Sequence, residues 1–133
     1  MKAKINWIKD YQMEGETDNG QQVIMDTGKN AVGPSPAQLV LQALAGCTMM
    51  DIVLILTKSR KHIEKFWVDV DAEEAKDYPK VFTKIHLLYN IKGVGLTEKE
   101  VERAIELSEK KYCRVLAMLE GSVKITSSCR IIQ

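Results

Sequence analysis

The chain has 133 residues, of which 45% are hydrophobic and 28% charged, a balance typical of one globular domain and unlike that of a disordered chain. Nineteen basic and eighteen acidic side chains give a formal net charge of +1, so no overall field favours nucleic acid or an anionic membrane as a partner. Three cysteines without a CxxC pair, and no apolar leader after Met1, predict a cytoplasmic protein with reduced thiols. We therefore expect a single domain over residues 1–133 that binds neither nucleic acid nor a membrane.

The first third of the chain is predicted to form three short strands. Residues 2–7 alternate polar and apolar side chains, which is the period of a half-buried strand. The segments 11–16 and 21–26 flank Asp18-Asn19-Gly20, and an Asn-Gly pair favours a tight hairpin turn. Glycines and prolines cluster between residues 28 and 36. The sequence thus predicts a small antiparallel meander followed by an irregular loop.

A long helix is predicted after this loop. Ser35 is a suitable N-cap, Pro36 fits the first helical position, and Gln38 can complete a capping box. Apolar side chains occupy every side of residues 39–56, so we expect burial all round. A membrane span is the competing interpretation, but Asp51 would cost about 2.5 to 3.5 kcal/mol on insertion. A small chain has few elements to surround such a helix, and a homodimer would supply a second copy.

Strands are predicted again after the long helix. Residues 66–72 and 80–92 alternate apolar with polar side chains, and Asp77-Tyr78-Pro79 lies between them. This arrangement predicts a second hairpin with long strands.

A second helix is predicted to begin after Thr97, because Thr97 and Glu100 fit a second capping box. The pattern allows this helix to continue, with or without a kink, through Cys113 to residue 119, and Gly121 is suited to end it. Residues 123–129 then alternate as a closing strand. The order βββαββαβ predicts an α+β fold rather than the strict alternation of a parallel sheet.

The sequence contains no recognisable metal or cofactor motif. His62 and His86 are isolated from one another, and the glycine-containing segments lack the spacing of phosphate-binding or dinucleotide-binding loops. We therefore expect neither a metal nor a cofactor.

The cysteines carry more information. Cys47 follows the small residues Ala45-Gly46, which would allow close approach of another backbone or a ligand. Cys113 lies between two lysines and Arg114, an electropositive setting that would favour the thiolate. From these residues alone, both cysteines are also compatible with a space-filling role, and we expect only that role for Cys129.

Three blocks of sequence carry a family resemblance. They are GPSPAQL at residues 33–39, ALAGCT at residues 43–48 with Asp51 after it, and EKKYC at residues 109–113. Together with the element order and the length, these blocks resemble the OsmC/Ohr family, the osmotically induced and organic-hydroperoxide-resistance proteins. The resemblance implies an OsmC-like fold, with antiparallel sheets packed on a long central helix in an intertwined homodimer.

The resemblance also implies a thiol-dependent peroxidase. Cys47 would attack the O–O bond of an organic hydroperoxide, and Cys113 would condense with the resulting sulfenic acid to form a disulfide, which an external dithiol then reduces. No cofactor is implied. The site would include an apolar pocket at the dimer interface. Its expected lining residues are Gln38, Gly46, Met50 and Asp51.

This chain departs from the family pattern at the group expected to stabilise the thiolate. The family's peroxidases use an early arginine held by a glutamate, whereas here no arginine precedes Arg60 and Ala37 occupies the expected glutamate position. Arg60 or Arg114 would have to supply the positive charge. The alternative functions are a small-molecule-binding protein without turnover, or a thiol relay, on the same scaffold.

Overall fold

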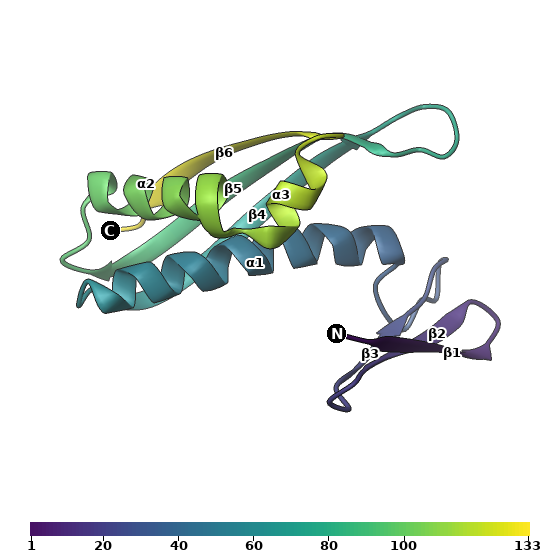
Figure 1. The fold of residues 1–133 in the computed structure, drawn as a ribbon. Helices are drawn as coiled ribbons and strands as arrows, with labels where there is room; N and C mark the ends of the chain where they lie inside the picture. The colour runs from purple at the N-terminus through teal and green to yellow at the C-terminus, as the bar shows by residue number, and fades with distance from the viewer. The chain divides into compact units, whose positions relative to one another are not determined.

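The computed structural model describes residues 1–133, and the chain forms two compact units, Met1–Gln42 and Ala43–Gln133. We call them the N-terminal unit and the C-terminal unit. The element order is the predicted one, with six strands and an α+β composition. The elements are labelled in Figure 1.

The N-terminal unit contains an antiparallel sheet of three strands in the order β1-β2-β3. Its strands are β1 (Ala3–Lys9), β2 (Gln12–Thr17) and β3 (Gln22–Met25). Gly20 has φ +88° in the turn between β2 and β3, a conformation that glycine adopts without steric cost. Ile5 and Trp7 are 57% and 69% exposed. The expected half-burial of β1 is therefore not met within the N-terminal unit, where no other element covers these apolar side chains.

The loop before the long helix is organised by Asp26, which is 7% exposed. Its two carboxylate oxygens accept the N–H groups of Thr27 and Val32 at 2.7 and 3.0 Å. Helix α1 (Pro36–Lys58) then begins with the predicted capping box, in which Gln38 N–H donates to Ser35 Oγ and Ser35 N–H donates to Gln38 Oε1.

The C-terminal unit contains a second three-stranded sheet in the order β4-β5-β6. Its strands are β4 (His62–Glu74), β5 (Phe82–Val94) and β6 (Lys124–Ile131). Strands β4 and β5 are antiparallel, whereas β6 is parallel to β5. The expectation of purely antiparallel sheets therefore holds for the first sheet only. The helical connection between β5 and β6 crosses over the sheet and returns the chain in the same direction.

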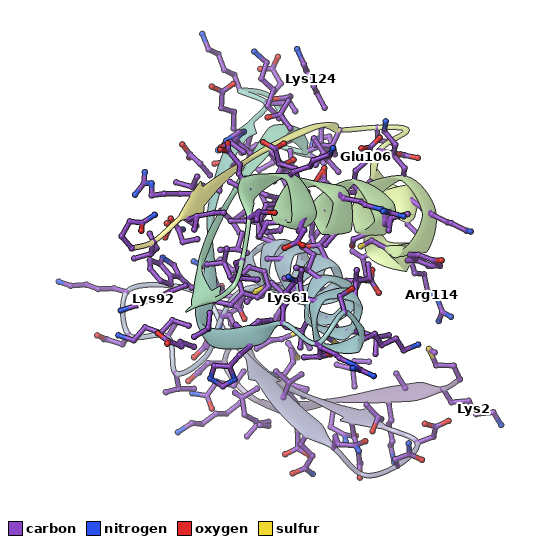
Figure 2. The ribbon with its side chains drawn as sticks, turned by 90° about the vertical axis from the view of Figure 1, so that its left-hand side faces the viewer. Lys2, Lys61, Lys92, Glu106, Arg114 and Lys124 are labelled. Carbon is purple, nitrogen blue, oxygen red and sulfur yellow. The ribbon has the colours of Figure 1, made fainter.

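The core of the C-terminal unit lies between this sheet and the helices on one of its faces (Figures 1 and 2). Alternate residues of β5 point to the helices and are at most 1% exposed; they are Ile85, Leu87, Tyr89 and Ile91. They pack in a layer with the buried side chains of α1 and α2 (Glu98–Leu107), which are Leu44, Ile52, Leu56, Val101, Ala104 and Ile105.

Helix α1 buries only part of its circumference within the chain. Met50 is 76% exposed and Leu54 is 52% exposed, so the predicted burial all round is not met by one chain. The helix is also long and apolar enough to cross a membrane, by a criterion that the core helix of a globular protein passes as well.

The second helix is interrupted where the sequence pattern allowed continuation. Helix α2 begins with the predicted Thr97–Glu100 capping box and ends at Leu107. A π-helical turn, η1 (Ser108–Tyr112), follows, and Cys113 then adopts an extended conformation before α3 (Arg114–Leu119). The break separates two helices and places Cys113 at the junction.

Candidate active site

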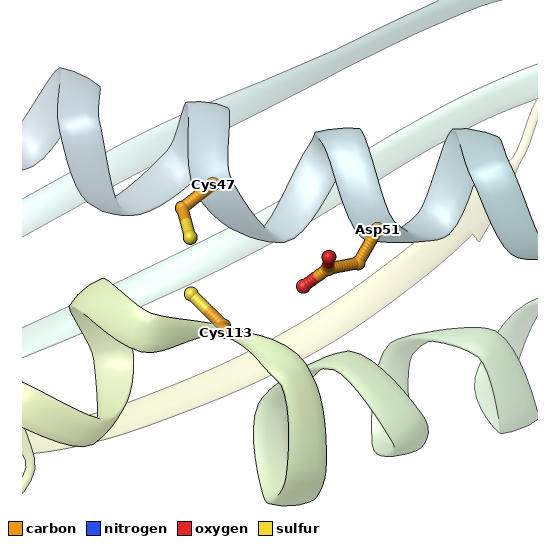
Figure 3. Close-up of side chains that lie close together, drawn as sticks. All are labelled: Cys47, Asp51 and Cys113. Carbon is orange, nitrogen blue, oxygen red and sulfur yellow. The ribbon is translucent and has the colours of Figure 1, made fainter.

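Helix α1 contributes two side chains to the candidate site. Cys47 and Asp51 are four residues apart within α1, so they lie on the same face of the helix about one turn apart. Thr48 between them is fully buried, and its hydroxyl donates to the carbonyl of Ala45 at 3.0 Å. This bond gives the buried hydroxyl a partner within the helix. The Cys47 and Asp51 side chains point toward the segment that contains Cys113 (Figure 3).

The π-helical turn contributes the second cysteine. Cys113 N–H donates to the carbonyl of Ser108 at 2.7 Å, which is the i to i+5 bond of a π-turn. The extended backbone of Cys113 makes it the N-cap of α3, and its Sγ accepts the N–H of Leu116 at 3.3 Å. A sulfur thus takes the position that a side-chain oxygen usually holds at a helix start.

The two elements bring three reactive side chains together (Figure 3). The sulfurs of Cys47 and Cys113 and a carboxylate oxygen of Asp51 all lie within 4.8 Å of one another. Ser108 Oγ donates to Asp51 Oδ2 at 2.9 Å and lies 3.4 Å from the carbonyl of Thr48. Because Ser108 is fully buried, this contact joins the π-turn directly to α1 and fixes the carboxylate beside the thiols.

A second polar network holds the π-turn from the sheet side. Tyr89 on β5 donates to Glu109 Oε2 at 3.1 Å, and Ser127 on β6 donates to Glu109 Oε1 at 2.8 Å. Burial raises the pKa of Tyr89 well above its ordinary value, so its hydroxyl stays a hydrogen-bond donor. Residues 108 to 113 are therefore anchored both to α1 and to the sheet.

The environment of Cys113 differs from the sequence expectation. Its side chain is buried, and this burial, with Cys47 beside it, raises the pKa of the Cys113 thiol to about 12. The neighbouring basic side chains do not reverse this effect, because Lys110 pairs with Glu106 at 2.8 Å and Arg114 is exposed. The basic residues next to Cys113 in the sequence therefore do not create the electropositive surroundings that we expected for its thiol.

Neither arginine proposed as a replacement cation is placed among the three reactive side chains. Arg114 extends outward from the start of α3 (Figure 2). Arg60 lies beyond the end of α1 with φ 61°, and the helical rise from Cys47 to Lys58, the last residue of α1, is already roughly 16 Å.

The expected pocket residues have different surroundings. Asp51 lines a cavity of about 410 Å³ whose other lining residues are Leu54, Ile55, Lys58, Ser59, Leu107 and Tyr112. Met50 is largely exposed, and a Cβ added at Gly46 would contact nothing within 4 Å. Gln38 is held in the capping box of the N-terminal unit. Within one chain, Asp51 alone of the four lines this cavity.

Comparison with known proteins agrees with this arrangement. The family model described as OsmC-like protein matches residues 27–128, which include every side chain of the candidate site. The chain belongs to the OsmC-like protein family. It is 36% identical over 132 residues to protein YhfA of Escherichia coli strain K12, with 99% of this chain and 98% of that protein covered.

Solved structures of OsmC-like proteins share the fold. The crystal structure of an OsmC-like protein from Mycoplasma pneumoniae superposes with a TM-score of 0.85 at 20% identity, covering 99% of this chain and 96% of that one. An organic hydroperoxide resistance protein from Elizabethkingia anophelis superposes with a TM-score of 0.67 at 17% identity, covering 96% and 94%. The fold class implied by the resemblance is thereby confirmed.

The donor atoms of the OsmC-like site fall short of a structural zinc site. Cys47, Asp51 and Cys113 offer two sulfurs and one oxygen within 4.8 Å of one another, whereas a structural zinc site uses four ligands. Closely spaced cysteines and histidines are the usual sequence signal of a metal site, whereas these three side chains come from two elements distant in the sequence. Sequence reasoning also missed Ser108, although a serine on the apolar face of α2 and η1 is a signal that could have marked it.

Proposed function

We propose that this OsmC-like protein is a thiol-dependent peroxidase that reduces organic hydroperoxides through Cys47 and Cys113. The observation that carries the proposal is that two sulfurs from separate elements lie within 4.8 Å of each other in the reduced state. A disulfide requires these sulfurs to approach to about 2.05 Å.

The proposed reaction has two chemical steps. The Cys47 sulfur attacks the terminal oxygen of the hydroperoxide, the O–O bond breaks, and the products are Cys47 sulfenic acid and an alcohol. The Cys113 thiol then attacks the Cys47 sulfur, forming the disulfide and releasing water. Sulfur loses two electrons overall while the peroxide gains them, and an external dithiol returns the protein to its starting state.

The assignment of roles to the two cysteines rests on their exposure. Cys47 is partly exposed, whereas Cys113 is 3% exposed and caps α3. A peroxide can therefore reach Cys47 more readily, and Cys113 is suited to the second, internal step. The cavity beside Asp51 has apolar walls that include Leu54 and Leu107, which supports an organic rather than an inorganic peroxide.

The test uses the reduced protein and one equivalent of cumene hydroperoxide, followed by intact and peptide mass spectrometry. We expect a Cys47–Cys113 disulfide in the wild type, no peroxide consumption in Cys47→Ser, and a dimedone-trapped Cys47 sulfenic acid in Cys113→Ser. Cys129→Ser is the matched control, because Cys129 lies on β6 outside the trio. Unchanged consumption in Cys47→Ser would refute the proposal.

We also propose that the protein acts as an intertwined homodimer of single OsmC-like domains, each spanning residues 1–133, in the cytoplasm. The exposed apolar side chains of β1 and α1, including Trp7 and Met50, support the dimer because a second chain could cover them. Met50→Glu should lower the sedimentation coefficient to that of a monomer. Met118→Glu makes the same change on exposed α3 and should leave the dimer intact.

A binding protein without turnover is the second candidate function. The observation that favours it is that Arg114 is exposed and points outward while Arg60 lies beyond the end of α1 (Figure 2), since desolvation without a cation disfavours the thiolate. Native mass spectrometry distinguishes the two functions. A retained apolar ligand in Cys47→Ser, together with no disulfide in the peroxide-treated wild type, would favour binding over catalysis, and persulfide adducts would indicate a thiol relay.

A further inference from the structure

The proposed peroxidase reaction requires a proton to leave a thiol in each of its two steps. Burial and the neighbouring Cys47 raise the pKa of Cys113 to about 12, so this thiol is protonated at neutral pH. Arg114 is exposed and extends outward from the start of α3, and Arg60 lies beyond the end of α1 (Figure 2). A peroxidase built on this site therefore needs a group that accepts the proton during the reaction itself.

Asp51 is the ionisable oxygen group of the trio. Its carboxylate extends from α1 toward the two sulfurs (Figure 3) and has an oxygen within 4.8 Å of both. The hydrogen bond from Ser108 Oγ to Oδ2 fixes the orientation of the carboxylate. Asp51 also lines the cavity of about 410 Å³ whose apolar walls suit an organic peroxide. One carboxylate is thus adjacent to both thiols and to this cavity.

We propose that Asp51 is the proton carrier of the site, taking the proton from each thiol and returning it to the oxygen that leaves. This inference rests on the proposed peroxidase function. A thiolate stabilised by a cation has already lost its proton. In this site each thiol reacts from its protonated form, and the carboxylate accepts the proton during the reaction.

Both steps balance with Asp51 in this role. In the first, Asp51 accepts the Cys47 proton as sulfur attacks the peroxide, and the departing alkoxide takes that proton to become the alcohol. In the second, Asp51 accepts the Cys113 proton as that sulfur attacks Cys47, and the departing hydroxide takes it to become water. Asp51 is ionised again after each step.

Removing the Asp51 carboxylate should change the rate of the peroxide reaction in opposite directions, depending on whether Asp51 carries protons or acts only as a nearby negative charge. A carboxylate that acts only through its negative charge destabilises a neighbouring thiolate, so its removal would increase the thiolate fraction and speed every reaction of the thiols. A carboxylate that transfers the proton instead supports the peroxide reaction, so its removal would slow that reaction. The two roles therefore predict opposite changes in rate.

The test compares Asp51→Asn with the wild type in single-turnover oxidation by cumene hydroperoxide and in alkylation by iodoacetamide. Iodide leaves without a proton, so alkylation reports the thiolate fraction alone. We expect oxidation to slow about 100-fold at pH 7, while alkylation is unchanged or faster. Asp71→Asn is the matched control, because Asp71 is an exposed aspartate on β4, and it should oxidise at the wild-type rate.

The pH dependence provides a second readout. The titratable and charged groups around Asp51 are the thiols of Cys47 and Cys113 and, along the shared cavity, Lys58 and Tyr112. The rate deficit of Asp51→Asn should narrow as pH rises, because solvent hydroxide can then take the proton that the carboxylate would otherwise accept. Asp51→Glu keeps a carboxylate at this position and should recover part of the lost rate.

Three results would overturn the inference while leaving the peroxidase function standing. They are wild-type or faster oxidation in Asp51→Asn, an equal slowing of oxidation and alkylation, and an oxidation deficit that stays constant with pH. Absence of a Cys47–Cys113 disulfide in the wild type would instead refute the proposed function. Circular dichroism of each variant identifies any that fails to fold. Ser108→Ala removes the hydrogen bond to Asp51 and provides an independent test. In this variant we expect slower oxidation without slower alkylation.

Discussion

The two three-stranded sheets of this OsmC-like protein have similar sequence patterns and different surroundings. In both, apolar and polar residues alternate along the strands. Ile85 on β5 is 1% exposed, whereas Ile5 on β1 is 57% exposed. Helices α1 and α2 lie against the sheet of the C-terminal unit, while the N-terminal unit contains only the first residues of α1 besides its strands. An alternating pattern thus defines an apolar face, and the other elements of the unit decide whether that face is covered.

The same substitution in each sheet would measure this difference. Ile85→Ala should lower the free energy of unfolding by about 2 to 5 kcal/mol, because it leaves a cavity in a packed core. Ile5→Ala should cost about 0.5 kcal/mol or less in a monomer. Urea unfolding at several protein concentrations gives both values. A large cost for Ile5→Ala that grows with protein concentration would show that a second chain covers β1, and a small cost for Ile85→Ala would contradict the described core.

Burial of Cys113 in the C-terminal unit should also make the free energy of unfolding depend on pH. Its pKa is raised from the ordinary value of 9.0 to about 12 in the folded protein, so the folded state holds the proton more tightly than the unfolded state. The contribution of this proton to the free energy of unfolding is fully present below pH 9 and is lost as pH rises toward 12. Between these values, unfolding free energy should fall by about 1.4 kcal/mol per pH unit more in the wild type than in Cys113→Ser.

Chemical denaturation of both reduced proteins from pH 7 to pH 10.5 would check this difference. Tyr89 is present in both proteins, and Cys113 is the smallest of the causes given for its raised pKa, so most of its titration cancels in the comparison. Parallel stability curves for the wild type and Cys113→Ser would show that the thiol is not desolvated as described.

The two capping boxes provide a case in which the two regions should behave alike. Ser35 caps α1 from the N-terminal unit, and Thr97 caps α2 in the C-terminal unit. Each replacement by alanine should cost about 1 kcal/mol, because each removes one exposed hydrogen bond to a helix N–H group. Thermal unfolding of Ser35→Ala and Thr97→Ala gives the comparison. A much larger loss at either cap would indicate contacts beyond the local bond.

Local signals in the sequence predicted most of the fold. The capping boxes at Ser35 and Thr97, the Asn-Gly turn before residue 21 and the alternation along β5 all act over a few residues, and each is present as predicted. The parallel pairing of β6 with β5 could not be obtained in this way, because it depends on how the helical crossover returns the chain.

The candidate site was predicted only in part for the same reason. The family resemblance indicated Cys47 and Cys113, and an aspartate in an apolar helix marked Asp51. The contact of Ser108 with Asp51 depends on the π-turn, which shifts side chains relative to a regular helix and has no simple sequence signature. The lysines beside Cys113 in the sequence suggested a stabilised thiolate, yet the fold directs the thiol inward and raises its pKa.

The sulfur cap of α3 couples the state of the cysteine pair to the backbone that follows it. The N–H of Leu116 donates to the thiol sulfur of Cys113, and α3 is only six residues long. A disulfide to Cys47 would turn this sulfur toward α1 and weaken it as an acceptor, so the first turn of α3 would lose its cap. Deuterium uptake at the Leu116 amide would then be faster in the oxidised protein. A short helix outside the reacting atoms would serve as a reporter of thiol oxidation.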